Sequence, residues 1–174
     1  MNAPAAAPAR ALLSPELIAM IDKGVSAIVA SRDAALRPSL MRAVGSTITP
    51  DGGEITVFLA RSQSRQLLQD LAATGQIAVV FSRPTTHRTV QVKARGISGR
   101  PATEADLPAL QRYLEAMEYE ICSIGHTASI VRAMLAFELH DLVAISFTPT
   151  EAFDQTHGPQ SGSPLPPASP PTPP

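Results

Sequence analysis

The chain has 174 residues, of which 44% are hydrophobic, so it can bury one sizeable core but is short for two well-built domains. Its 14 Lys and Arg residues are balanced by 15 Asp and Glu residues, and only 4% of the residues are aromatic. This composition argues against nucleic-acid binding, which needs a basic surface and, for single strands, stacking rings.

Disulfide, metal and membrane chemistry are also disfavoured. Cys122 is the only cysteine, so no disulfide can form within the chain, which fits a reducing compartment. The histidines show no zinc-ligand spacing, so no metal site is predicted. No apolar run reaches the length of a membrane span, and residues 1–13 lack the continuous apolar core of a secretory signal. We therefore expect a cytoplasmic protein that contacts neither nucleic acid nor membrane.

The two ends of the chain contrast with its middle. Residues 1–13 are rich in Ala and Pro, and residues 156–174 end in the run GPQSGSPLPPASPPTPP. Such segments hold too few apolar side chains to offset the entropy of ordering, so both are predicted to be disordered. A polyproline ligand for a partner protein is an open alternative for the tail. The folded domain is predicted to span residues 14–155.

Folding signals begin at Ser14, an N-cap residue that is followed by Pro15 and Glu16. They predict a short helix that ends at Gly24, because glycine adopts the left-handed turn after a helix at little cost. Residues 25–31, VSAIVAS, form an apolar run of strand length. The chain is therefore predicted to pass from a helix directly into a buried strand.

Two further strands and a helix are predicted next. Residues 39–49 and 54–60 are separated by the turn PDGGE, which favours an antiparallel pair. From residue 61 the apolar residues fall at helical spacing, and Gly75 marks the end of that helix. Residues 76–82 then carry apolar side chains at alternate positions, as in a strand.

The second half of the chain opens with a strongly alternating segment. In residues 88–97, small apolar residues alternate with Thr89, Gln91, Lys93 and Arg95, so one face of this strand is predicted to be core and the other polar. The remaining predicted elements are helices over residues 103–121 and 127–137 and a strand over residues 142–147.

This order of elements shows no regular alternation of strand and helix, so a doubly wound parallel sheet is disfavoured. About six strands with an antiparallel start favour a barrel, because closure protects the edges of the sheet. The predicted fold is mainly β within the α+β class: a six-stranded antiparallel split β-barrel with peripheral helices.

Arg42 is the first candidate for a binding role. Alternation along residues 39–49 places it on the same side as Leu40, Val44 and Ile48, where a cation has nothing to neutralise it. A bound anion would explain this position. The alternatives are that the face turns to solvent at this point or that an acidic side chain pairs with Arg42, and both remain open.

A second candidate is the cluster Arg61, Ser62, Ser64 and Arg65 at the predicted start of a helix. Unpaired backbone N–H groups and the helix dipole favour an anion there, and the hydroxyls and guanidiniums add donors. Ordinary N-capping of the helix by one serine, with arginines that point into solvent, would explain the same residues equally well.

The third candidate is the polar face of residues 88–97, whose amide and ammonium groups suit the ring or the phosphate of a cofactor. A solvated outer strand face is the alternative. The three candidates follow one another on a strand, at a helix start and on a strand.

In this order, residues 17–153 resemble the FMN-binding split barrels related to pyridoxamine 5′-phosphate oxidase. The matching segments are RPSLMRAVG, LARSQSRQLLQDLAATGQIAVVFSRP and HRTVQVKARG. The resemblance implies bound FMN and a homodimer with two FMN sites at the interface, each built from both subunits. The flavin would carry the electron transfer, so no catalytic side chain is predicted.

The resemblance also implies which residues touch the cofactor. In that family a strand arginine and its successors meet the FMN phosphate and ring, a serine and a basic residue at the next helix start hold the phosphate, and a later strand glutamine contacts the flavin. The implied contacts are Arg42, Ala43, Val44, Thr47, Leu59, Ser62, Ser64, Arg65, Gln91 and Lys93.

The chain departs from the oxidase at two places. The oxidase has a serine, arginine and lysine run at the helix start, whereas here Ser64 and Arg65 are followed by Gln66. The oxidase's substrate-binding tail also has no counterpart. We therefore expect an FMN-dependent oxidoreductase whose small-molecule substrate is not pyridoxamine phosphate. A non-catalytic flavin or haem binder of the same fold, and a cofactor-free interaction module, are the alternatives.

Overall fold

The computed structural model describes residues 12–166, which form four α-helices, two short 3₁₀ helices and nine strands. The helical elements are α1 (Pro15–Lys23), α2 (Arg65–Thr74), η1 (Glu104–Asp106), α3 (Leu107–Ser123), α4 (Ala128–Met134) and η2 (Leu139–Asp141). The strands are β1 (Ser26–Arg32), β2 (Pro38–Arg42), β3 (Gly45–Ile48), β4 (Ile55–Ala60), β5 (Gln76–Ser82), β6 (Thr89–Arg95), β7 (Ser98–Pro101), β8 (Leu142–Phe147) and β9 (Glu151–Asp154).

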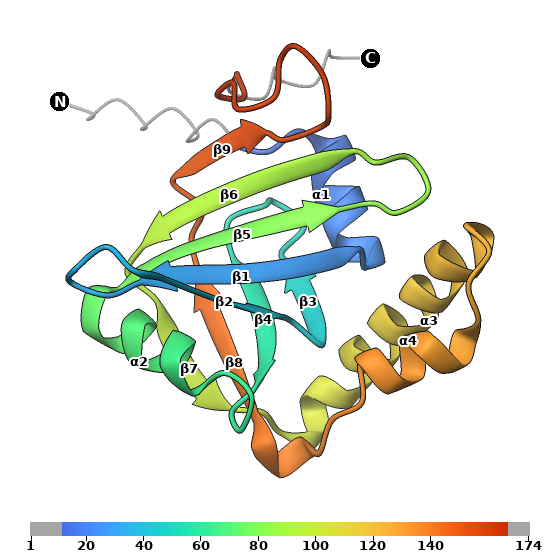
Figure 1. The fold of residues 1–174 in the computed structure, drawn as a ribbon, viewed down its shortest axis with the longest axis horizontal. Helices are drawn as coiled ribbons and strands as arrows, with labels where there is room; N and C mark the ends of the chain where they lie inside the picture. Colours follow the sequence, from blue (N-terminus) through green and yellow to red (C-terminus); the bar gives the residue numbers. More distant parts are fainter. Residues whose placement is uncertain (1–11, 167–174) are drawn as a thin grey trace, which may run out of the picture.

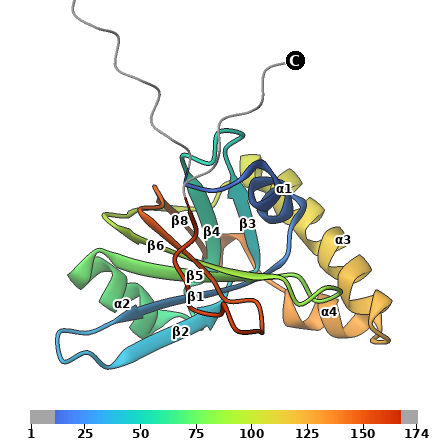
Figure 2. The ribbon, with the colours of Figure 1, turned by 90° about the horizontal axis from the view of Figure 1, so that it is seen from above.

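The strands form two antiparallel sheets. A five-stranded sheet has the order β2-β1-β5-β6-β9, and a four-stranded sheet has the order β3-β4-β8-β7. Figures 1 and 2 show the two sheets stacked with crossing strands and the four helices around them. The predicted antiparallel α+β fold is confirmed, but the predicted count of six strands is wrong, since nine strands lie within the described residues.

One predicted strand, residues 39–49, is in fact two strands that belong to different sheets. The Ala43 N–H donates to the Ala27 carbonyl of the five-stranded sheet at 2.9 Å, and the Val44 N–H donates to the Phe58 carbonyl of the four-stranded sheet at 2.9 Å. The chain therefore crosses between the sheets at residues 43–44. Strands β7 and β9 were not predicted, because each has only four residues and carries no sustained apolar period.

The main core lies between the two sheets. Strands β1, β5 and β6 each bury every second side chain against it, which is the pattern that their alternation predicts. Leu17 and Ile21 of α1 and Leu67 and Leu71 of α2 join the same core. Helices α1 and α2 lie at opposite ends of the sheets (Figures 1 and 2), so each closes one end of the core.

Helix α3 covers the outer face of the four-stranded sheet, where Leu110 packs with Phe58 and Ala144. Gly45 permits this close approach, because a Cβ atom at that position would lie 2.5 Å from Leu110 Cδ2. The other side of α3 packs on α4, with Tyr113 in the centre of that contact. Leu110 and Met117 of α3 are thus buried within one protomer, whereas Leu107 remains 39% exposed.

Two carboxylates anchor the ends of α3. Asp106 accepts hydrogen bonds from both terminal nitrogens of Arg100 at 2.7 Å each, and the Thr103 N–H donates to it at 2.8 Å. The hydrogen bonds from Arg100 are the main cause that lowers the pKa of Asp106 to about 2. Near the other end, the fully buried Glu120 accepts from Arg83 Nε at 2.9 Å. These pairs tie α3 to β7 and to the β5–β6 hairpin.

Thr85 completes the site of the Glu120 carboxylate. Its hydroxyl and backbone N–H both donate to Glu120 Oε2, at 2.5 and 3.2 Å. Burial by itself raises the pKa of Glu120, but the hydrogen bonds from Thr85 and Arg83 outweigh this effect and hold the pKa below its usual value. The carboxylate is therefore both buried and charged.

The described structure extends past both predicted domain boundaries. Leu13 is only 1% exposed and belongs to the main core. Residues 155–165 turn back along β9, where the Leu165 N–H donates to the Ala152 carbonyl at 2.8 Å and Pro164 forms a β-bridge with Phe153. The rest of the two segments predicted to be disordered, residues 1–11 and 167–174, lies outside the described residues.

Candidate functional site

A row of side chains crosses the outer face of the five-stranded sheet. Residues opposite each other on antiparallel strands point to the same face. The strand register therefore aligns Arg42, Ile28, Val80, Gln91 and Phe153 in one row. Arg42 and Gln91 share this face, but β1 and β5 lie between them, which separates their backbones by about 14 Å at the usual strand spacing.

Arg42 is the last residue of β2, immediately before the chain crosses between the sheets. It shares its face with Leu40, which is 63% exposed, as predicted, but Val44 and Ile48 are buried after the crossing. Its Nη1 donates to Ser26 Oγ at 2.9 Å. Of the explanations that the sequence left open, the structure supports a face that turns to solvent.

A second row on the same face holds Leu40, Ala30, Ala78, Lys93 and Glu151. The Lys93 ammonium lies 4.4 Å from the centre of the Phe153 ring, at the distance of a cation–π contact. The polar face predicted for residues 88–97 is confirmed, because the residues that alternate with Gln91 and Lys93 are buried.

An open depression of about 360 Å³ lies at one end of this face, where β1 ends and β5 begins. Its lining includes Arg32, Lys93 and Arg95. Among these, Lys93 was predicted as a cofactor contact and Arg95 as part of the same polar face, whereas Arg32 was not predicted. The sequence around Arg32 is polar, which is typical of a loop between strands. The alternation of buried and half-buried residues in β1 nevertheless continues as far as Arg32, and this alternation could have identified it as a strand residue.

The start of α2 is the second part of the candidate site. Ser64 is the N-cap residue, but its backbone angles, φ −114° and ψ 21°, are not those of an extended cap, and its side chain makes no capping hydrogen bond. Ser64 is 2% exposed, and its Oγ has no hydrogen-bond partner in the described structure. The first turn of α2 carries no acidic residue. At the start of α2, the Ser64 hydroxyl therefore lacks an acceptor within the described residues, and no negative charge of the first turn balances the positive end of the helix dipole.

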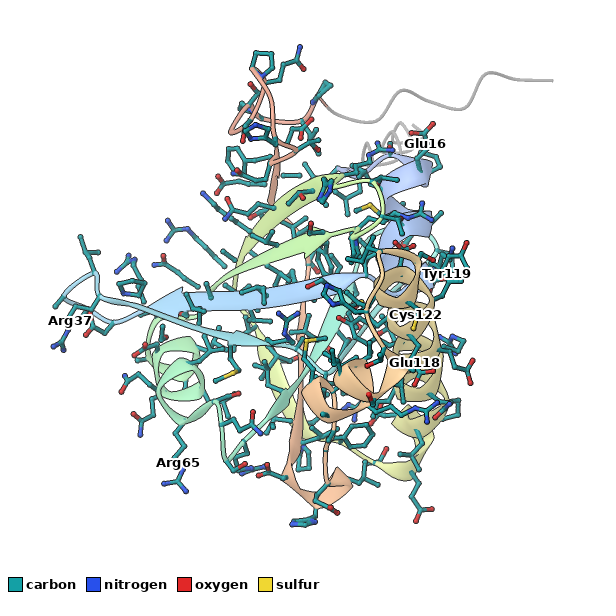
Figure 3. All side chains as sticks on the ribbon, turned by 45° about the vertical axis from the view of Figure 1, so that its right-hand side comes forward. Glu16, Arg37, Arg65, Glu118, Tyr119 and Cys122 are labelled. Carbon is teal, nitrogen blue, oxygen red and sulfur yellow. The ribbon has the colours of Figure 1, made fainter. Side chains whose placement is uncertain are left out.

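Arg65, the first residue of α2, is exposed and extends from the helix into solvent (Figure 3). Ser62 is already engaged, because its Oγ and N–H donate to Asp141 at 2.5 and 3.0 Å. These hydrogen bonds, first among them the one from the Ser62 hydroxyl, lower the pKa of Asp141. At the start of α2, Ser62 is thus already hydrogen-bonded to Asp141, whereas the side chains of Ser64 and Arg65 remain available to bind a ligand.

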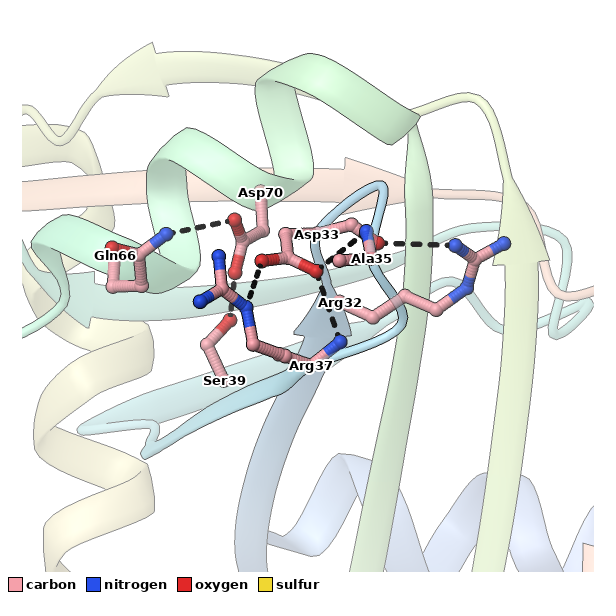
Figure 4. Close-up of polar contacts among 7 residues, drawn as sticks. All are labelled: Arg32, Asp33, Ala35, Arg37, Ser39, Gln66 and Asp70. Atoms are coloured by element: carbon pink, nitrogen blue, oxygen red, sulfur yellow. Dashed lines mark hydrogen bonds and ion pairs between the residues drawn. The ribbon is translucent and has the colours of Figure 1, made fainter.

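Helix α2 does not share the outer face with Arg42. Asp70 of α2 is buried and accepts hydrogen bonds from Ser39 Oγ at 2.6 Å and from Gln66 Nε2 at 2.9 Å (Figure 4). Ser39 and Arg42 point to opposite sides of β2, because they are three positions apart along the strand. The start of α2 and the Arg42 row therefore do not form one site within a protomer.

The remaining predicted contacts lie in the interior or on the other sheet. Ala43, Val44 and Leu59 are buried in the apolar clusters, so their side chains are not open to a ligand. Thr47 faces Thr56 across β3 and β4, and the Thr56 Oγ1 lies 2.7 Å from Ser146 Oγ. The structure thus divides the predicted contacts among the start of α2, the outer face of the five-stranded sheet and the region around β3 and β4.

Residues 12–166 contain neither a metal-binding cluster nor a membrane-spanning helix. Over that range, no cluster of three or more His, Cys, Asp or Glu side chains is arranged to hold a metal ion. Within the same residues, every helix falls short of the length and apolarity that a membrane span requires.

The sequence matches no protein-family profile and no curated protein, but solved structures match its fold. A candidate pyridoxamine 5′-phosphate oxidase from Lactobacillus delbrueckii matches with a TM-score of 0.52 and 14% identity, over 81% of this chain and 93% of its own. An F420 reductase matches with a TM-score of 0.52 and 15% identity, over 77% and 93%.

HupZ from Group A Streptococcus matches with a TM-score of 0.51 and 14% identity, over 86% of this chain and 99% of its own. At such low identities a match shows the fold and not the activity. The chain therefore has the fold of the split barrels related to pyridoxamine 5′-phosphate oxidase.

Proposed function

We propose that this protein binds FMN, with the phosphate at the start of α2, and acts as an oxidoreductase on a small organic molecule. The observation that carries the proposal is the hydroxyl of Ser64, which is buried and without a partner where the helix begins. A buried hydroxyl without a partner costs free energy, so such groups are rare unless a ligand completes them.

The donors at this helix start suit a phosphate dianion. The N–H groups of the first turn have no acceptor inside the helix, and the positive end of the dipole favours an anion. Arg65 adds a guanidinium, and no acidic residue of the first turn competes for these groups. When bound, FMN supplies the electron transfer through its ring, and the protein supplies placement and hydrogen bonds.

The structural neighbours support the redox part of the proposal. The candidate pyridoxamine 5′-phosphate oxidase and the F420 reductase both carry the names of redox enzymes. The departures at Gln66 and in the C-terminal segment favour a substrate other than pyridoxamine phosphate. We therefore leave the substrate class of the oxidoreductase open.

The test is the absorption spectrum of the freshly purified full chain, followed by a thermal unfolding scan with added FMN. We expect flavin absorption, or an apoprotein that FMN at about 100 times its Kd stabilises by about 2.7 kcal/mol, roughly 5–10 °C in Tm. A haem spectrum would support the haem-binding alternative. A colourless protein with an unchanged Tm would contradict FMN binding and favour an interaction module.

We also propose that two copies pair through the outer face of the five-stranded sheet. Figure 1 looks onto this face, and no helix within the described residues lies over it. Its centre is apolar, with Ile28 and Val80 only half-buried and Leu40 largely exposed. Apolar side chains on both faces are typical of a sheet that is covered on both sides. A second copy seated on the row of Ile28 and Val80 would bring another Gln91 to the interface.

Val80→Lys tests this interface, because it places a charge at the centre of the face. We expect light scattering to show a dimer for the natural chain and a monomer with unchanged circular dichroism for the variant. Ala133→Lys, at an exposed position of α4, is the control and should leave the dimer intact. A monomeric natural chain, or a dimer that tolerates Val80→Lys, would contradict the proposed pairing.

A further inference from the structure

The depression at the end of the five-stranded sheet is distinct from the start of α2. It has a volume of about 360 Å³ and contains neither Ser64 nor Arg65. Small-molecule sites in proteins have volumes of a few hundred cubic ångströms and combine an apolar floor with a few polar groups. The depression has both elements, and they come from β1, β5, β6 and β9.

Three cations surround the depression. Arg32, Lys93 and Arg95 line it together with a single acidic residue, Glu151. In the part of the chain that the structure describes, none of the three cations forms an ion pair. Like charges gathered without counter-charges raise the local positive potential. The three cations and one carboxylate leave an excess of two positive charges, which matches a dianion.

The strand register places Arg32 and Arg95 on the same face, two strands apart. Arg95 is opposite Gln76 on the neighbouring strand, and Arg32 follows Ala30 on the far side of that strand. Their backbones are thus about 10 Å apart, at twice the usual strand spacing. In Figure 4 the Arg32 side chain extends from β1 across β5, with Nη1 held at 3.2 Å by the Asp33 carbonyl. One group between them is within reach of both arginines and of the Gln76 amide.

The floor of the depression adds an apolar component. Ala30 and Ala78 face each other across β1 and β5 and both line the depression. Their small side chains leave room for a flat group to lie against the sheet. We propose that this depression binds a small organic phosphate monoester, with the phosphate between Arg32 and Arg95 and the organic part over the two alanines.

Phenyl phosphate is a suitable probe because it joins a dianion to a flat ring. We expect calorimetry to show that it binds the full chain more tightly than inorganic phosphate, which lacks the apolar part. Arg32→Ala and Arg95→Ala should each weaken its binding about tenfold, which corresponds to one charge-assisted hydrogen bond. Arg112→Ala is the matched control, since Arg112 is exposed on α3, which packs on the other sheet, and does not line the depression. It should leave the affinity unchanged.

The site does not depend on the proposed FMN function, and Arg65→Ala separates the two. Binding of phenyl phosphate that is lost with Arg65→Ala and retained in Arg32→Ala and Arg95→Ala would mean that the probe occupies the start of α2, and would overturn the second site. No binding, or equal affinities for phenyl phosphate and inorganic phosphate in all variants, would overturn it as well. Loss in Arg32→Ala and Arg95→Ala with Arg65→Ala unchanged would support it, whether or not the protein binds FMN.

Discussion

Arg65→Ala is expected to weaken FMN binding at least about tenfold, whereas Arg95→Ala should leave the Kd within about twofold. A hydrogen bond between a guanidinium and a phosphate contributes about 1.5–3 kcal/mol, and every 1.4 kcal/mol is a factor of ten. Arg65 stands at the proposed phosphate-binding helix start, and Arg95 lines the separate depression. Flavin fluorescence titration of both variants measures the difference. Equal dissociation constants would place the phosphate elsewhere.

Ser64→Ala is the companion variant, because it separates a ligand contact from a structural contact. The hydroxyl makes no hydrogen bond within the described structure, so its removal should not lower the Tm of the protein without FMN. FMN affinity should nevertheless fall, since the phosphate loses a donor. A Tm that drops in the free protein, with FMN affinity unchanged, would show that the hydroxyl serves the fold alone.

Arg83→Met is expected to destabilise the protein by about 3 kcal/mol, or roughly 6–12 °C in Tm. Methionine keeps much of the packing volume but leaves the fully buried Glu120 carboxylate with Thr85 as its only partner. Removal of one member of a buried ion pair leaves an uncompensated charge, which costs more than the pair contributes. Chemical denaturation at neutral pH measures the loss.

The pH dependence of that loss identifies its cause. In the natural chain the pKa of Glu120 is lowered, so its contribution to stability is present above about pH 4.5 and is lost as the pH falls further. Without Arg83, two of the effects that lower this pKa are lost, so the pKa of Glu120 rises relative to the natural chain and the variant loses less stability when the carboxyl is protonated. The difference in unfolding free energy should therefore shrink as the pH falls from neutral into the acid range. A difference that is constant with pH would point to lost packing.

Glu120→Gln is the control for the charge. It removes the carboxylate but keeps the shape, and Arg83, whose side chain is 34% exposed, can turn to water. We expect a loss smaller than that of Arg83→Met and nearly independent of pH. A larger loss for Glu120→Gln would mean that Arg83, and not Glu120, is the group that needs its partner.

The sequence predicted the parts of the fold that rest on local rules. Ser14 does cap α1, with its Oγ accepting from the Leu17 N–H, and Gly24 and Gly75 follow their helices with positive φ. The alternation of residues 88–97 correctly separated core from surface. These features depend on neighbours within a few residues, so composition and periodicity were enough to find them.

The errors arose where distant parts of the chain meet. The break at residues 43–44 is set by hydrogen bonds to Ala27 and Phe58, which lie in different sheets and leave no local signal. Strands β7 and β9 are defined by their pairing partners and not by their own residues. Glu120 reads as one more polar position of a helix, although it is fully buried beside Arg83.

The candidate site was predictable only in part for the same reason. The cluster at residues 61–65 and the polar face with Gln91 and Lys93 were visible as patterns, although Ser64 of the cluster is buried. Periodicity within a segment does not describe how these two segments lie relative to each other, which is set by the packing of α2 and by the sheet order. Arg32 lies near Lys93 and Arg95 only because β1, β5 and β6 pair side by side. Its place in the lining of the depression could therefore not be predicted without the sheet register.

The turn back of residues 155–165 has a consequence for solubility. The outer strand of a sheet offers free backbone groups on which another chain can add a strand. Here the Asp154 N–H donates to the Ser163 carbonyl and the Leu165 N–H donates to the Ala152 carbonyl, so the chain's own end occupies that border. A protein shortened after Asp154 would present this edge to its neighbours and become prone to aggregate by strand addition, although the start of α2 and the depression were untouched.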